Sequence, residues 1–189
     1  ASAFDSAGQR CSALRVLCLQ DEIADHTLKM LRGAMAECRM GNPGRLTTDI
    51  GPVIDSEAKA NIERHIQTMR SKGRPVFQAV RENSEDAREW QSGTFVAPTL
   101  IELDDFAELQ KEVFGPVLHV VRYNRNQLPE LIEQINASGY GLTLGVHTRI
   151  DETIAQVTGS AHVGNLYVNR NMVGAVVGVQ PFGGEGLSG

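Results

Sequence analysis

Short apolar runs alternate with amphipathic helical patterns along most of the chain, and this alternation constrains the fold more than any other feature. The runs are too short for helices and are not half polar, so they indicate strands buried on both faces. The expected strands are residues 14–19, 75–80, 95–102, 116–123, 142–147 and 163–169, and the expected helices are 21–40, 55–73, 104–111, 126–137 and 151–161. The pattern predicts an α/β fold with a doubly wound, largely parallel sheet and helices on both faces.

The segments between these elements indicate where a site would lie. Prolines and glycines make residues 49–54 an irregular connection, and the polar residues 81–93 are expected to form a surface loop. Ligands of open parallel sheets bind beyond the carboxyl ends of the strands. We therefore expect the functional site in the loops that follow strands, above all in the glycine-rich tail of residues 170–189.

Composition excludes several classes of partner. The 189 residues are 41% hydrophobic and 22% charged, with a net charge of −5 and no basic stripe. Nucleic acids and anionic membranes attract clustered cations, so neither is an expected partner. The apolar runs fall short of the about 20 residues that span a bilayer, and the odd number of cysteines fits no disulfide framework. We expect a soluble, cytoplasmic protein without a metal site.

Cys11 is the best candidate for chemistry. It follows a glycine-containing turn and has Arg10 and Ser12 as neighbours. A cysteine attacks as the thiolate, which nearby positive charge favours. The alternative from the residues alone is a buried, inert thiol, which is the usual state of a free cysteine. Cys18 lies in an apolar strand pattern and Cys38 on a helix face, so both are predicted to be packing residues.

Four strings, in order along the chain, resemble the aldehyde dehydrogenase superfamily. They are FDSAGQRC at residues 4–11, EVFGPV at 112–117, Asn136 with YGL at 140–142, and Gly164-Asn165 through Asn169 to PFGG at 181–184. The resemblance implies that residues 1–189 form the cysteine-bearing catalytic domain of a longer chain, without the upstream cofactor-binding domain. No G-x-G-x-x-G motif follows an expected strand anywhere in the chain, which agrees with that expectation.

The resemblance also implies a reaction. Cys11 would attack an aldehyde to give a thiohemiacetal, which loses hydride to NAD and leaves a thioester for water to hydrolyse. The backbone N–H of Cys11 would donate to the oxyanion, whereas the second donor and the hydrolytic glutamate would lie upstream. Glu112 and Phe114 match the family residues that bind the nicotinamide ribose and ring. From the residues alone, a surface glutamate and a core phenylalanine are the favoured interpretation.

The tail resembles one branch of the family, the Δ1-pyrroline-5-carboxylate dehydrogenases, including the carboxy-terminal module of bifunctional proline utilization A proteins. That resemblance implies oxidation of L-glutamate γ-semialdehyde to glutamate. Ser12, Gly174 and Ala175 would hold the substrate's α-carboxylate, and Phe182 would line its aliphatic part. Uncharged donors suit a carboxylate held beside a thiolate, although ordinary turns also explain the glycines. A dimer or larger oligomer is expected, with FAD only if a proline dehydrogenase domain precedes this segment.

Three alternatives stay open. One is an aldehyde dehydrogenase of other specificity, and another is an inert module that serves oligomerisation. The third is a cysteine hydrolase, which needs an imidazole beside the thiol. No histidine lies in a recognisable motif, so none is assigned a catalytic role; the histidines are His26, His65, His119, His147 and His162.

Overall fold

The computed structural model describes all residues except 80–89, 91 and 176–177. The larger elements, in chain order, are β1 (Val16–Gln20), α1 (Asp21–Glu37), α2 (Ser56–Ser71), β2 (Val76–Gln78), β3 (Thr99–Leu103), β4 (Val117–Tyr123), α4 (Leu128–Ala137), β6 (Thr143–Val146), α5 (Asp151–Ser160) and β7 (Asn165–Val168). The shorter ones are the 3₁₀ turns η1 (Asp5–Gly8), η2 (Phe106–Glu108) and η3 (Arg125–Gln127) and the strands β5 (Tyr140–Gly141) and β8 (Glu185–Gly186). Strands and helices alternate over much of the described chain as the pattern predicts, except that no strand separates α1 from α2 and only the 3₁₀ turn η2 separates β3 from β4.

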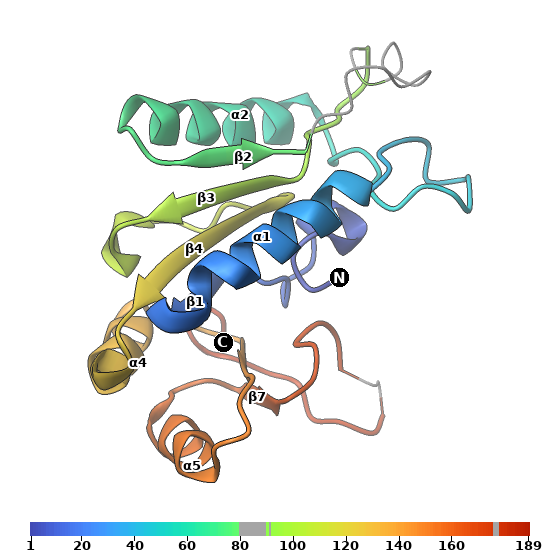
Figure 1. Cartoon of the computed structure of the whole chain (residues 1–189). Coiled ribbons are helices and arrows are strands. Elements are labelled where there is room, and N and C mark those ends of the chain that lie inside the picture. Colours follow the sequence, from blue (N-terminus) through green and yellow to red (C-terminus); the bar gives the residue numbers. More distant parts are fainter. Residues whose placement is uncertain (80–89, 91, 176–177) are drawn as a thin grey trace.

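The central sheet has four strands in the order β1-β4-β3-β2 (Figure 1). Strand β4 pairs in parallel with both β1 and β3, while β2 pairs antiparallel with β3. A second parallel pair, β6 and β7, forms a separate sheet, and β5 pairs with β8. The prediction of a largely parallel α/β sheet is confirmed, with the edge strand β2 as the exception.

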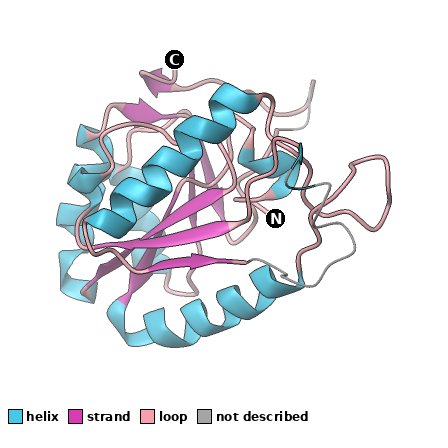
Figure 2. Ribbon diagram, turned by 90° about the horizontal axis from the view of Figure 1, so that it is seen from above, coloured by secondary structure: helices cyan, strands magenta, loops and turns pink. Residues whose placement is uncertain are grey.

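Helices cover the central sheet from two sides (Figure 2). Helix α1 buries Ala24, Leu28 and Met35, and α2 buries Ile62, Ile66 and Met69. These positions recur every three or four residues, so each helix presents one apolar stripe to the strands. The strands supply the other half of the core, with Leu100, Ile101, Val117, Leu118 and Val120 at most 2% exposed.

Two local predictions are wrong. Residues 104–111 do not form an α-helix. They contain only the single 3₁₀ turn η2, which Asp105 and Glu108 close with a capping box. The position of Asn136 near the end of the 126–137 pattern predicts a helix C-cap, but α4 ends at Ala137 and its C-cap is Ser138. The Asn136 side chain instead joins the ends of two helices, donating to the carbonyl of Ser160 and accepting from the amide of His162.

Two further points concern segments outside regular core elements. Most of the loop predicted at residues 81–93 falls outside the described residues. The tail, expected to be irregular, contains β8, which pairs with β5. In the described part of the chain, no helix has the length and apolar character needed to cross a membrane.

Candidate active site

The turn that carries Cys11 is built from unusual backbone conformations. Ser6, Ala7 and Gly8 all have positive φ, between 53° and 66°. Non-glycine residues rarely adopt this region, so surrounding contacts must hold the turn. Phe4 and Ala7 are buried beneath it. The Cys11 side chain, by contrast, is exposed, so the turn presents the thiol to solvent.

Two of the predicted motifs meet at a pair of glycines. A Cβ atom on Gly8 would lie 2.1 Å from the carbonyl oxygen of Gly115. Only glycine therefore allows the cysteine turn to approach the 112–117 loop this closely. The turn is fixed on its other side by Gln9, whose side-chain oxygen accepts from the amide of Ile54 at 2.8 Å.

Arg15 joins the same two motifs through its side chain. Its Nε donates to the carboxylate of Glu112 at 2.9 Å, and its guanidinium carbon lies 4.6 Å from the centre of the Phe114 ring. Burial lowers the pKa of Arg15 from its ordinary value, while the hydrogen bond that Arg15 donates to Glu112 opposes that shift. Glu112 and Phe114 remain accessible, at 36% for the Glu112 side chain and 45% for Phe114.

The cysteine turn also contacts the tail. Ser12 is only 3% exposed, and its Oγ accepts a hydrogen bond from the amide of Gly174 at 3.1 Å. Ala175 follows directly and is half-buried. The structure thus brings together Cys11, Ser12 and the Gly174-Ala175 segment, which are far apart in the sequence.

Asparagines hold the tail in place. Asn169 has positive φ, and its side chain pairs with both the amide and the carbonyl of Thr148 at the end of β6. Asn165 is buried and donates to the carbonyls of Leu142 and Gly183. Phe182, next to Gly183, is 46% exposed. Phe182 is not among the described residues that line the cavity at Cys11.

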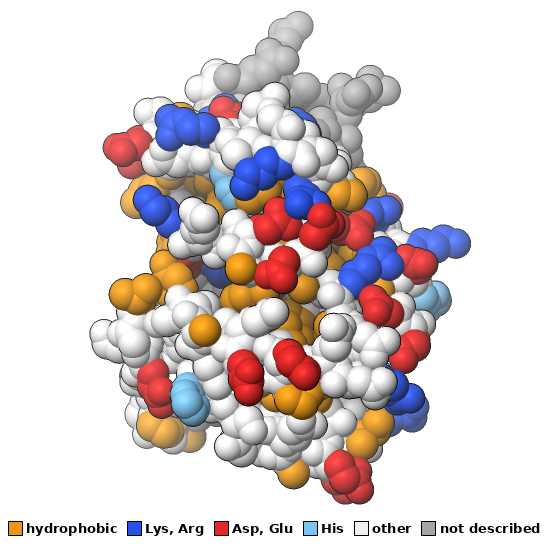
Figure 3. All heavy atoms as spheres, turned by 90° about the vertical axis from the view of Figure 1, so that its left-hand side faces the viewer, with side chains coloured by type: hydrophobic (Ala, Val, Ile, Leu, Met, Phe, Trp, Pro, Cys, Tyr) orange, Lys and Arg blue, Asp and Glu red, His pale blue; other side chains and the backbone are white. Residues whose placement is uncertain are grey.

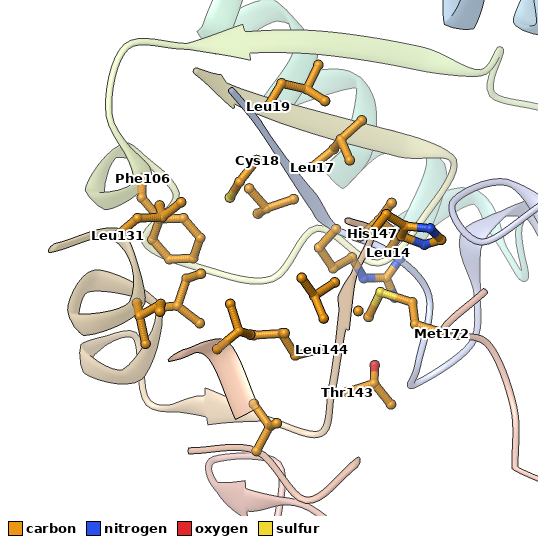
Figure 4. Close-up of a pocket in the computed structure, with 18 of the residues that line it drawn as sticks. Leu14, Leu17, Cys18, Leu19, Phe106, Leu131, Thr143, Leu144, His147 and Met172 are labelled. Carbon is orange, nitrogen blue, oxygen red and sulfur yellow. The ribbon is translucent and has the colours of Figure 1, made fainter. Parts of the chain in front are cut away.

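A cavity of about 670 Å³ extends from the cysteine turn between β1 and β6 (Figure 4). Cys11, Glu112 and Met172 line one part of it, whereas Leu17 and Leu144 belong to its apolar part. The lining therefore includes a thiol and a carboxylate as well as leucine side chains from the two sheets. On the face shown in Figure 3, basic and acidic side chains are interspersed, with apolar side chains visible between them.

Two histidines that are far apart in the sequence lie side by side in the structure. The Nε2 atoms of His65 on α2 and His119 on β4 are 2.8 Å apart. Burial lowers the pKa of His119 to about 4 and also lowers that of His65. None of the hydrogen bonds in the described part of the chain joins Cys11 to an imidazole. Nor do the described residues contain a cluster of three or more side chains suited to a metal ion.

Sequence reasoning missed Arg15 and the His65–His119 pair. A signal existed for Arg15, because it is the charged residue within the apolar run of residues 14–19, four positions after Cys11. A cation on a strand that enters the core needs buried partners. The histidine pair had no such signal, since its members are 54 residues apart.

Comparison with known proteins agrees with the geometry. The chain is 94% identical, over its whole length, to the bifunctional protein PutA of Salmonella typhimurium, and it spans 14% of that relative. A crystal structure of Bradyrhizobium japonicum proline utilization A (PutA) superposes with a TM-score of 0.90 at 49% identity, covering 99% of this chain and 18% of that one. A 1-pyrroline-5-carboxylate dehydrogenase from Thermus with bound NAD gives 0.84 at 36% identity, covering 98% of this chain and 34% of that one.

The family assignment follows from a match along the whole chain. The model of the aldehyde dehydrogenase family matches residues 1–189. The strings that resemble this family are the segments that the structure packs around Cys11, Glu112 and Gly174. The chain belongs to the aldehyde dehydrogenase family.

Proposed function

We propose that this chain is the cysteine-bearing catalytic domain of an NAD-dependent dehydrogenase that oxidises L-glutamate γ-semialdehyde to L-glutamate. The observation that carries the proposal is the hydrogen bond from the Gly174 amide to Ser12. It joins Ser12, the residue after the exposed Cys11, to the backbone of the Gly174-Ala175 segment. In the proposal, the thiol and a set of uncharged donors share one cleft, and the hydrogen bond supports this by bringing the two segments together.

The proposed chemistry begins with the thiolate of Cys11, which adds to the aldehyde carbon to form a thiohemiacetal. Bound NAD would accept the hydride released from that carbon. The product is a thioester, which water cleaves to the carboxylic acid, returning the thiol. The backbone N–H of Cys11 is the proposed donor to the oxyanion in both addition steps.

Glu112 and Phe114 are the proposed cofactor-binding residues. The Glu112 carboxylate is held by Arg15 yet accessible, which suits an acceptor for sugar hydroxyls. Phe114 is a large apolar ring left 45% exposed with Arg15 on it. An exposed aromatic beside a nucleophile gains free energy when a second flat ring covers it. Both features fit a bound nicotinamide nucleotide.

The proposed substrate is a short aldehyde with an α-carboxylate. Ser12 accepts from Gly174 and still has its hydroxyl hydrogen to donate, and the amide of Ala175 is the next donor along the segment. Phe182 is assigned to the aliphatic part of the substrate. The name of the Thermus relative, a 1-pyrroline-5-carboxylate dehydrogenase, supports this choice of substrate class.

The rest of the parent protein is part of the proposal. Because the chain spans 14% of the Salmonella relative, we assign the hydrolytic glutamate, the second oxyanion donor and most cofactor contacts to segments outside residues 1–189. A dimer or larger oligomer is proposed for the parent, with FAD only where a proline dehydrogenase domain is present.

The nucleophile is tested with the full-length parent protein. Cys11→Ala should abolish aldehyde oxidation while NAD binding, measured by calorimetry, is kept; Cys38→Ala is the matched control and should leave turnover unchanged. Retained turnover in the Cys11 variant would refute the assignment. Absence of heat with both NAD and glutamate in the wild type would instead indicate an inert module.

The substrate is tested by comparing glutamate semialdehyde with 4-aminobutanal, which differs only in lacking the carboxylate. Ser12→Ala should raise KM for the semialdehyde by about tenfold, the value of one hydrogen bond to a charged group, and should leave KM for 4-aminobutanal unchanged. Equal effects on both aldehydes would contradict the carboxylate site and favour another substrate class.

A further inference from the structure

We infer that Arg15 is a positioning residue that holds the cysteine turn and the cofactor-binding Glu112 in one fixed arrangement. The inference rests on the proposed function and extends it, because the hydrogen bonds of the Arg15 side chain go to groups around Cys11 and not to its thiol. It acts through the groups that it holds.

Four hydrogen bonds support this role. Besides the bond from Nε to Glu112, Nη2 donates to the carbonyl of Arg10 at 3.1 Å, the residue directly before the nucleophile. Nη1 donates to the carbonyls of Gly8 at 2.5 Å and Gly115 at 3.5 Å. One guanidinium therefore joins three backbone carbonyls and a carboxylate from the two motifs.

The chemistry of the side chain explains why arginine stands here. A guanidinium is planar and offers five N–H donors in fixed directions, whereas an ammonium offers a point charge that cannot reach all these acceptors together. The Arg15 side chain is only 13% exposed, so its bonds are shielded from water. Its flat face also covers one side of the Phe114 ring.

The strand beneath fixes the backbone from which the side chain projects. The carbonyl of Arg15 accepts from the amide of His119 at 2.9 Å, next to the first paired residue of β1. The side chain thus extends from the end of a core strand into two loops. Such an anchor transmits the rigidity of the sheet to segments that have little regular structure.

The test uses the full-length parent protein with Arg15→Gln, Glu112→Gln and the double variant. The readout is the Kd for NAD by calorimetry, with turnover as a second measurement. Arg15→Gln should raise the Kd about tenfold, the value of one lost charge-assisted bond. If Arg15 acts through Glu112, the double variant should bind NAD no more weakly than Glu112→Gln alone.

Arg122→Gln is the matched control. Arg122 also bonds two carboxylates, Glu102 and Asp25, but does so at the far end of β4. The Arg122→Gln substitution should leave the Kd for NAD unchanged. The Kd for NAD of Arg15→Lys should fall between those of wild type and Arg15→Gln. If Arg15→Gln does not fold, Arg15→Lys is the test variant.

A wild-type Kd in Arg15→Gln or Arg15→Lys would overturn the inference, as would independent, multiplicative effects in the double variant. These outcomes differ from failure of the proposed function. In that case, the wild-type parent would not bind NAD, or Cys11→Ala would keep its turnover.

Discussion

At the scale of single residues, the site depends on a glycine at position 8, which has no side chain. Gly8 combines positive φ with a contact so close that its added Cβ would overlap the carbonyl of Gly115. The family string GQxC thereby has a physical reason: its glycine lets the nucleophile's turn reach the loop that carries Glu112.

Gly8→Ala should lower the free energy of unfolding by roughly 1 to 3 kcal/mol, because alanine is strained at this φ and displaces the neighbouring loop. Urea denaturation of the 189-residue chain measures the change. Gly33→Ala in α1 is the matched control, since its Cβ meets nothing within 4 Å. It should stabilise the chain by about 0.5 to 1 kcal/mol. Equal stabilisation by both substitutions would argue against the close contact.

The three cysteines should differ in reactivity toward iodoacetamide. Cys11 is exposed, whereas burial raises the pKa of Cys18 to about 12, and Cys38 donates its thiol hydrogen to the carbonyl of Ala34. Mass spectrometry of the labelled native chain should find Cys11 modified first and Cys18 last. Cys11→Ala should remove the fast phase, and labelling of Cys18 at the rate of Cys11 would contradict the described burial.

At the scale of elements, the histidine pair links α2 to the sheet. His119 is fully buried and its ring contacts the carbonyl of Arg15 and the ring of His65. Its pKa of about 4 lies below the ordinary 6.5, so between these values the unfolded chain binds a proton that the folded chain excludes. Stability is therefore present above pH 6.5 and is lost as the pH falls toward 4.

The expected loss from His119 between pH 7 and pH 4 is on the order of 3 kcal/mol. His119→Gln cannot take up that proton, so its free energy of unfolding should change less over this range than that of wild type. Denaturation series at several pH values measure the difference, with His26→Gln, at an exposed position of α1, as control. Parallel curves for wild type and His119→Gln would show that the pair does not titrate as described.

Elements with a clear period were predictable, and those set by tertiary contacts were not. The existence of α1 and α2 follows from apolar spacing, and strand β4 follows from a continuous apolar run that is buried on both faces. The direction of β2 depends on its partner β3, and the side chain of Asn136 depends on α5. The local sequence around β2 or Asn136 does not indicate either contact.

At the scale of the whole molecule, the site joins residues 162 positions apart, Ser12 and Gly174. Periodicity cannot predict such a contact; only the family resemblance indicated it. Arg15 shows the same limit, since its charge was visible in the sequence but its four acceptors come from two loops about 100 residues apart. The family resemblance identifies the residues of the candidate site, and the folded chain brings Ser12 and Gly174 together.

The cavity between β1 and β6 gives a prediction for the chain as a whole. Its volume of about 670 Å³ and its leucine-rich walls should let the 189-residue chain bind the dye ANS, which fluoresces in accessible apolar sites. Leu144→Arg places a charge in the apolar part and should weaken binding, whereas Leu46→Arg, at a fully exposed position, should not. Because partial unfolding also exposes apolar surface, each titration needs a matching near-UV spectrum that shows native packing. Equal ANS binding by both natively packed variants would mean that the dye binds outside this cavity.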